Sequence, residues 1–541
     1  MGIVFIVFLI CTAVVALIGY TKSKNGNTST TDGYFLAGRG LSSIVIATSM
    51  LLACLSTEQI SGQAGIAFMS NMSGAVCWEV GCIIGIVAMA LIFAPRYLKR
   101  GVATMPEFLG KTYDKQTQTL VSILLMASYV ATAIPTVLYS GAIVFNGIFN
   151  VSGLLHVSDF VAIAIICAAI GIIGLIYTVF GGLRMIAFTD TAYGVLLLVG
   201  CVSVPFFALY KLGGGSIGGG LSAMMAAVPH EKLSAISAAN ASAPEFPWPT
   251  LFLGVATMWF YYWCTSQMII QKTFAAKSLK EAQKGILTCA AFKLAGPLYL
   301  GGCGILAFAL FKGTDVFERI VSTNGDLAYT MLIQHVIPKP ILGFVCAAVF
   351  GAVLSSFNGA VNATSTLFSL DVYKQYIKPD ASEKQVVRVG HIFGFVLAAI
   401  AVCIAPFIMF ASGGLYNLML DLTGFINAPI LAAVLFAMFY KKCPPIAVKI
   451  VIPFHVVMYA LFMYIIKLPI HSNYTIGIMF WIDVLLMFII SQVKPRDVKE
   501  VPEDDNVVDV TPWKYAKLAA AILFCGVAAY YVIFSPLVLA K

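Results

Sequence analysis

Polar residues between Ser56 and Gly65 interrupt an apolar run, residues 43–69, that is long enough to cross a bilayer. They include the carboxyl group of Glu58 and the amide of Gln59. A carboxylate near the centre of a membrane helix costs about 2.5–3.5 kcal/mol on insertion scales, and small polar residues at this density favour a locally unwound helix. Backbone groups freed by unwinding are tolerated at that depth only where protein or a water-lined cavity satisfies them. The segment is therefore predicted to line a polar site halfway across a membrane.

Two further charged side chains fall within apolar runs. Glu79 lies in the run 74–95, and Lys293 lies in the run 286–311. A lysine inside a membrane needs an anionic partner or a water-filled cavity. The alternative for Lys293 is a place near the helix end, from which its side chain extends to the interface.

Aromatic and hydroxyl side chains mark two more runs. The centre of the run 249–270 reads MWFYYWCTSQ (258–267), and Ser355 and Ser356 stand together in the run 340–369. Aromatic belts belong at membrane interfaces, so this many ring-bearing hydrogen-bond donors at mid-span favour a solute site. Packing between helices is the alternative for the aromatic residues and for both serines.

The composition of the chain requires that membrane helices position these residues. Of 541 residues, 60% are hydrophobic and only 11% are charged, whereas soluble domains carry about 25% charged residues. The sequence predicts an all-α polytopic membrane protein embedded in a lipid bilayer. About fourteen candidate spans are expected, near 3–20, 43–69, 74–95, 118–148, 157–179, 186–210, 249–270, 286–311, 340–369, 388–410, 413–440, 446–466, 474–492 and 516–537.

The net charge of +9 reflects topology. With the N-terminus outside, most of the 33 Lys and Arg fall in the connections that would face inward, from 21–42 to 494–515, as the positive-inside rule requires. An even number of helices then places both termini outside. The basicity needs no nucleic-acid partner, and the first run, which has no basic residues before it, is predicted to be a retained helix and not a cleaved signal peptide.

Two of the predicted spans are interrupted by polar residues. These are the second and seventh predicted spans, five helices apart, and corresponding broken helices in two halves are typical of transporters with inverted repeats and a midplane site. This favours an alternating-access transporter over a channel or sensor. An enzyme is not expected, because no metal-ligand cluster or nucleophile–base pair is visible in the spacing.

Several long motifs resemble the sodium:solute symporter family, and most closely its sodium/glucose and bacterial sodium/galactose branch. They are GYFLAGR, LSTEQISGQAG, RGVATMPEFL, GGLRMIAFTD, YYWCTSQMIIQKTFAAKSLKEAQKG and VLSSFNGAVNATSTLFSLDVYK. The resemblance implies a LeuT-type core of two inverted five-helix repeats, 43–210 and 249–440. A first helix with its linker (1–42) and three peripheral helices (441–541) would flank that ten-helix core.

The resemblance also implies positions for the coupling ion, sodium, and for the solute. Sodium would be held by the carbonyls of Leu52, Leu55 and Ala352 and by the hydroxyls of Ser355 and Ser356, and Asp190 would assist its exit toward the cytoplasm. The matching positions for a sugar are Gln59, Glu79, Cys82, Trp259, Lys293 and Leu420, with Tyr262 as an aromatic gate.

Three of these positions depart from the sugar-transporting branch. Trp259 replaces an Asn, Leu420 replaces a Gln and Cys82 replaces a Ser. Losing two amide partners weakens hexose binding unless other groups compensate, so a deoxy, modified or smaller polar substrate is an alternative, as is a stacking role for Trp259.

The expected function is sodium-coupled import of a sugar, such as galactose or glucose, or of a sugar-like solute. The expected location is a bacterial-type cytoplasmic (inner) membrane. A sodium symporter for a vitamin, carboxylate or amino acid is the alternative, and a channel or sensor on the same fold is a more distant one.

Overall fold

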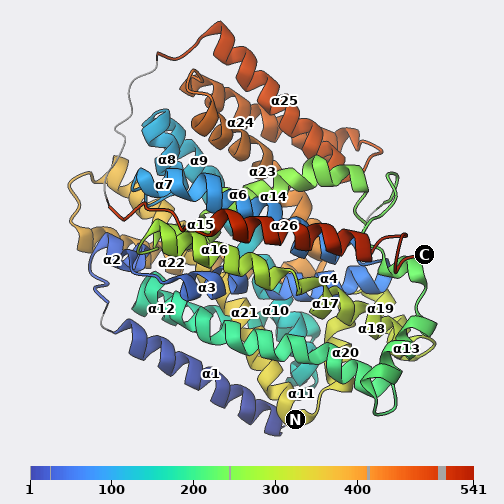
Figure 1. Cartoon of the computed structure of the whole chain (residues 1–541). Coiled ribbons are helices and arrows are strands. Elements are labelled where there is room, and N and C mark those ends of the chain that lie inside the picture. Colours follow the sequence, from blue (N-terminus) through green and yellow to red (C-terminus); the bar gives the residue numbers. More distant parts are fainter. Residues whose placement is uncertain (1, 25, 243–244, 411–414, 498–506) are drawn as a thin grey trace.

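A computed structural model describes residues 2–24, 26–242, 245–410, 415–497 and 507–541 (Figure 1). Within these ranges, eleven helices are long and apolar enough to cross a membrane, and two bent helix pairs raise the number to thirteen. The predicted span 249–270 is instead two shorter helices, α14 (Gly254–Cys264) and α15 (Gln267–Phe274). The all-helical membrane fold is confirmed, whereas the count of fourteen spans is not.

The remaining helices follow the predicted runs closely. Some spans, such as Ser73–Lys99, are divided into several successive helices, and other short helices lie in the connections. These remaining helices are α1 (Gly2–Ser23), α2 (Thr31–Phe35), α3 (Ser43–Cys54), α4 (Thr57–Met69), α5 (Ser73–Val76), α6 (Ile83–Ala88), α7 (Ala94–Lys99), α8 (Met105–Thr112), α9 (Lys115–Ser128), α10 (Ile134–Phe149), α11 (Val151–Leu155), α12 (Asp159–Leu212), α13 (Ile217–Ala227), α16 (Leu279–Lys293), α17 (Gly296–Tyr299), α18 (Gly301–Phe311), α19 (Asp315–Ser322), α20 (Ala328–Val336), α21 (Lys339–Thr366), α22 (Glu383–Ile404), α23 (Leu415–Phe439), α24 (Pro445–Ala460), α25 (Ser472–Val493) and α26 (Ala516–Ile533).

Both predicted broken spans are broken in the structure. α3 and α4 meet at a 57° bend, where Leu55 leaves the helical conformation (φ −89°, ψ 55°) and Ser56, with an extended backbone, precedes the first residue of the next helix. α14 and α15 are separated at Thr265 and Ser266. A third bend, of 45°, separates α16 from the helices that begin at Gly296; the sequence signal for it is the proline that follows.

α12 contains two predicted spans joined by the glycine turn. Gly182 has a positive φ of 54°, which divides the 54-residue element, and a Cβ there would lie 2.6 Å from the Tyr34 carbonyl oxygen. Only glycine fits both constraints. α12 packs against α21, α3 and α1, and α1 lies at the lower edge of the molecule in Figure 1.

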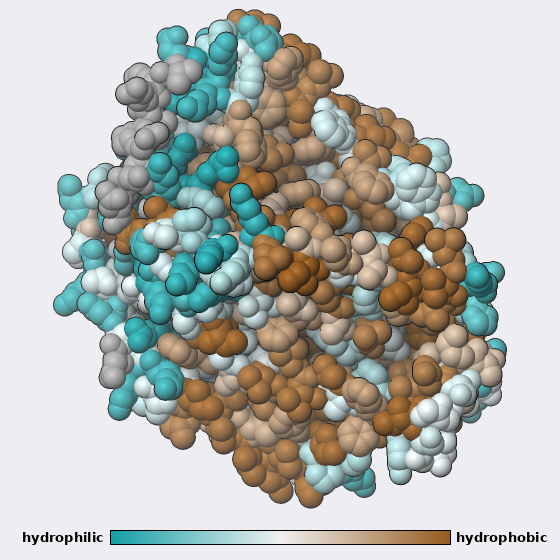
Figure 2. Space-filling view, in the orientation of Figure 1, coloured by the Kyte–Doolittle hydropathy of each residue, from teal (hydrophilic) through white to brown (hydrophobic). Residues whose placement is uncertain are grey.

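The predicted inward-facing connections lie at one end of the helix bundle. Arg39 Nη2 donates to the Gly101 carbonyl at 3.0 Å, Lys449 binds Asp114 at 2.6 Å, and the Leu279 amide donates to the 507–515 segment. Figure 2 shows hydrophilic residues gathered at this end, over α2 and α8, and a hydrophobic band beside it. The structure thus groups these loops as expected, and the side of the membrane that they face stays a prediction.

The last helices pack outside the core through a buried polar contact. α24 and α25 lie at the edge opposite α1 (Figure 1). His455 Nδ1 is 2.7 Å from Asp483 Oδ2, with both side chains fully buried, and His455 Nε2 is 3.1 Å from the Gly424 carbonyl oxygen. The carboxyl group of Asp483, which has no sequence-based role, therefore joins α25 to α24, and His455 joins α24 to α23.

Candidate functional site

The break between α3 and α4 faces α21, which stays helical past both serines. Ser356 Oγ donates to the Ala53 carbonyl at 3.1 Å. Ser355 Oγ is buried, and the carboxyl group of Asp190 lies close enough to interact with it. The other predicted sodium positions, Leu52, Leu55 and Ala352, are fully buried. The structure therefore places the Ser356 hydroxyl against the α3–α4 break, and the full set of sodium ligands stays a prediction.

Asp190, the predicted exit residue, lies on α12 and is hydrogen-bonded to α3. Its Oδ2 accepts a hydrogen bond from Ser49 Oγ on α3, and its side chain is 2% exposed. Lys272 on α15 is also fully buried, close enough to interact electrostatically with Asp190. Sequence reasoning missed Lys272, because its position at the end of a span suggested a connection at the membrane surface.

Glu79 and Lys293 form a fully buried ion pair. Lys293 Nζ lies 2.7 Å from Glu79 Oε2, with neither side chain exposed. Gln63 Nε2 donates to Glu79 Oε1 at 2.9 Å and to Gln59 Oε1 at 2.8 Å. Lys293 also donates to Cys54 Sγ at 3.5 Å. Lys293 therefore has an anionic partner inside the protein and does not extend to the membrane interface.

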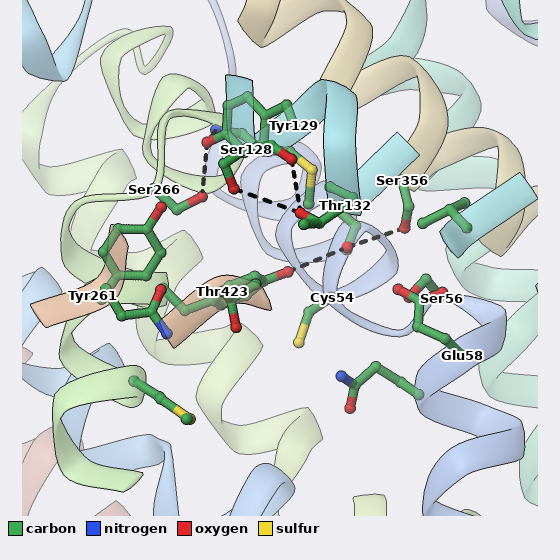
Figure 3. Close-up of a pocket in the computed structure, with 18 of the residues that line it drawn as sticks. Cys54, Ser56, Glu58, Ser128, Tyr129, Thr132, Tyr261, Ser266, Ser356 and Thr423 are labelled. Carbon is green, nitrogen blue, oxygen red and sulfur yellow. Dashed lines mark hydrogen bonds between the residues drawn. The ribbon is translucent and has the colours of Figure 1, made fainter. Parts of the chain in front are cut away.

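A cavity lies between the α3–α4 break, the α9–α10 helix, the α14–α15 break and α23 (Figure 3). Of the predicted sugar positions, Gln59 and Tyr262 line it. Its described lining residues are Ala53, Cys54, Ser56, Glu58, Gln59, Trp78, Ser128, Tyr129, Thr132, Ala133, Val137, Met258, Tyr261, Tyr262, Trp263, Ser266, Met268, Ser356, Thr423, Ile426 and Asn427.

The other predicted sugar positions are not among these lining residues. Glu79 and Lys293 lie behind Cys54 and Gln59. Cys82 Sγ is 3.6 Å from the Glu79 carbonyl oxygen. The Trp259 ring packs over Gly81, where a Cβ would come within 2.4 Å of it. The side chain of Leu420 lies outside the described residues.

The polar residues of the predicted span 118–148, among them Tyr129, suggested a helix that faces a cavity, but residue types alone indicated no specific partner for Tyr129. Tyr129 lies in a π-helical turn (Tyr129–Ala133) that continues α9, and such turns are frequent at functional sites. Its hydroxyl is 3.0 Å from Ser266 Oγ and accepts from the Met268 amide at 3.2 Å, so it stabilises the α14–α15 break (Figure 3). These contacts join distant parts of the chain, and residue spacing gives no sign of them.

A membrane protein with two broken helices around an internal cavity, whose largely apolar lining includes hydroxyl and amide groups, belongs to the class of solute transporters. The family model of the sodium:solute symporter family matches residues 34–445. A symporter of Escherichia coli (strain K12), YidK, is 38% identical over 522 residues, covering 96% of this chain and 89% of that protein. The sodium/glucose cotransporter of Vibrio parahaemolyticus is 29% identical over 451 residues, covering 81% of this chain and 80% of that protein.

Comparison with solved structures supports the same fold. A sodium-coupled sialic acid symporter superposes with a TM-score of 0.76 at 18% identity, covering 91% of this chain and 99% of the other. The chain belongs to the sodium:solute symporter family. It is a transporter and not an enzyme, its core has the LeuT-type fold, and sodium is its coupling ion.

Proposed function

We propose that the protein imports a sugar or sugar-like polyol together with sodium by alternating access. One backbone carbonyl with two contacts carries this proposal. The Ala53 carbonyl, at the α3–α4 break, accepts from Ser356 Oγ at 3.1 Å and lies 3.5 Å from the Tyr262 hydroxyl, which lines the cavity. The proposed sodium site and solute site therefore share one backbone group, so each ligand favours the arrangement that the other needs.

The sodium ligands in this proposal are the carbonyls of Leu52, Leu55 and Ala352 and the hydroxyls of Ser355 and Ser356. Sodium holds α3 and α21 together and stabilises the outward-open arrangement, which raises solute affinity by linkage. Asp190 receives the ion on its way out. Each positive charge that moves inward gains about 2.3 kcal/mol per 100 mV of membrane potential, and this gain drives accumulation of the solute. In this proposal the membrane is a bacterial-type cytoplasmic membrane. The lysine-rich end of the protein faces the cytoplasm, and both termini lie on the outer side.

The chemistry of the cavity fits a polyol. Gln59 and the hydroxyls of Ser128, Thr132 and Ser266 line one space with the Tyr262 ring, so hydroxyl partners and a stacking surface lie together. Relatives include sodium/glucose cotransporters and a sodium/myo-inositol cotransporter of Mus musculus, which is 28% identical over 458 residues. Glu79 and Lys293, behind the lining, hold Gln59 through Gln63 and are proposed to contact the solute when the cavity closes.

A sodium symporter for a different solute is the second candidate. Trp259 stands where an amide is expected, and it packs over Gly81 away from the cavity lining. This arrangement removes one expected sugar partner. A vitamin, an amino acid or another small polar solute therefore competes with a hexose, whereas a carboxylate is disfavoured because Glu58 lines the cavity.

Uptake into proteoliposomes tests the proposal. Labelled galactose, glucose and myo-inositol are supplied separately, with an imposed sodium gradient and, in parallel, with a proton gradient alone. Accumulation of at least one of them in the sodium arm, and none in the proton arm, is expected. If none of the three is accumulated while sodium still raises the thermal unfolding midpoint, the protein is a sodium symporter whose solute is not one of these polyols.

A further inference from the structure

The cavity lining carries one acidic side chain and no basic one among the described residues. The acidic one is Glu58. Two buried lysines contact lining residues without lining the cavity themselves. Lys293 binds Glu79 at 2.7 Å, and Lys272 Nζ donates to the Met268 carbonyl at 3.4 Å. The ion pair behind the lining is therefore neutral as a unit, and the lining itself carries one acidic group.

Glu58 has hydrogen-bond donors around it but, among the described residues, no ion pair. Its side chain is 7% exposed. Ser140 Oγ donates to Oε2 at 3.4 Å, and the Ser56 hydroxyl and the Glu58 backbone amide, at the start of α4, are further donors. A carboxylate at membrane depth is costly without a cation or strong hydrogen-bond donors. Glu79, twenty-one residues further along the chain, binds Lys293 and accepts a hydrogen bond from the Gln63 amide. The two carboxyl groups therefore differ in whether a cation neutralises them.

Two further polar groups lack partners in the lining. The Tyr261 hydroxyl and Asn427 Oδ1 are buried without a hydrogen-bond partner among the described residues, and both residues line the cavity. Figure 3 places Tyr261 on the side opposite Glu58 and Ser56. Buried polar atoms normally find a partner. Asn427 Oδ1 calls for a donor on the ligand, and the Tyr261 hydroxyl can accept from it or donate to it.

The remaining walls suit a cation. The rings of Tyr129, Tyr261 and Tyr262 line the same space, and aromatic faces attract ammonium groups. We propose that the solute is a polyol that carries a protonated amine, an amino sugar or amino-cyclitol, and that Glu58 selects it by binding the ammonium group. This inference rests on the proposed sodium-coupled polyol transport and specifies the class of its solute.

The test compares three sugars that differ at one carbon: glucose, glucosamine and N-acetylglucosamine. Each competes for sodium-driven uptake of labelled glucosamine into proteoliposomes. In the wild type, glucosamine is expected to bind about 10- to 100-fold more tightly than glucose, because a charge-assisted hydrogen bond exceeds a neutral one. N-acetylglucosamine keeps the nitrogen without its charge and is expected to lose this advantage. Raising the pH until the amine is neutral is expected to remove it as well.

The variant Glu58→Gln keeps the shape of the side chain and removes its charge. It is expected to bind glucosamine and glucose about equally, whereas Asp421→Asn, a half-buried carboxyl group outside the described lining, is expected to keep the preference. Sodium-dependent thermal stabilisation shows that each variant is folded. If Glu58→Gln does not fold, the pH dependence and the acetylated sugar in the wild type still decide the question.

Three outcomes overturn the inference. Equal wild-type affinities for glucosamine and glucose, with sodium-driven uptake of both, refute selection by charge and leave the proposed polyol transport standing. A Glu58→Gln variant that needs more sodium for both sugars equally assigns Glu58 to the ion. Sodium-dependent stabilisation without uptake of any sugar refutes the polyol proposal itself.

Discussion

The buried ion pair between Lys293 and Glu79 predicts strongly non-additive mutations. Neither side chain is exposed and Nζ lies 2.7 Å from Oε2, so Lys293→Met leaves a carboxylate without its cation. Breaking such a pair costs about 3–5 kcal/mol, whereas replacing both partners by neutral groups of similar volume is often close to neutral. Glu79→Gln retains an oxygen that accepts from Gln63 Nε2. The double variant is therefore expected to be more stable than Lys293→Met by about 2 kcal/mol or more.

Thermal unfolding in detergent, with sodium and without added sugar, measures this difference for the wild type, both single variants and the double variant. Sodium-driven sugar uptake measured in parallel separates the two roles of the pair. If Glu79 and Lys293 contact the solute, the double variant regains stability without regaining uptake. Additive losses of stability would refute the reasoning, because they would mean that each side chain is held by other partners.

Other predictions concern the ion site, a close contact between two backbone segments, and the buried carboxyl group of Asp326. Ser356→Ala is expected to raise the sodium concentration for half-maximal uptake, since it removes a proposed ligand; unchanged sodium dependence would contradict that site. A Cβ on Gly65 would lie 2.9 Å from the Gly325 carbonyl oxygen, so Gly65→Ala is expected to lower stability by about 1–3 kcal/mol, and Gly302→Ala, with 3.6 Å of space, is the control. Burial raises the pKa of Asp326, between α19 and α20, to about 6. The folded state thus keeps a proton that the unfolded chain releases at pH about 4, and stability is expected to fall as the pH rises from about 4 to 6. Asp326→Asn should reduce this fall in pH-dependent melting; an identical profile would show that other groups cause it.

The sequence by itself determined the membrane class, the broken helices and the family. Hydrophobic content and span length are local properties, because in a bilayer each helix must satisfy its own backbone hydrogen bonds. The dense polar residues after Leu55 predicted the break between α3 and α4, because polar side chains at this depth favour a local unwinding of the helix around a polar site. The glycine turn at 181–182 was also readable, since only glycine suits the backbone at Gly182.

The tertiary structure decided which polar groups neutralise one another and which face the cavity. Glu58 and Glu79 are both acidic residues inside apolar runs, yet only Glu79 meets a lysine, and only Glu58 lines the cavity. Trp259 and Tyr262 lie three residues apart on α14, yet only Tyr262 lines the cavity, and Trp259 packs over Gly81. A composition pattern gives the depth of a side chain in the membrane. Its partner depends on how helices distant in sequence pack together, and no local pattern contains that information.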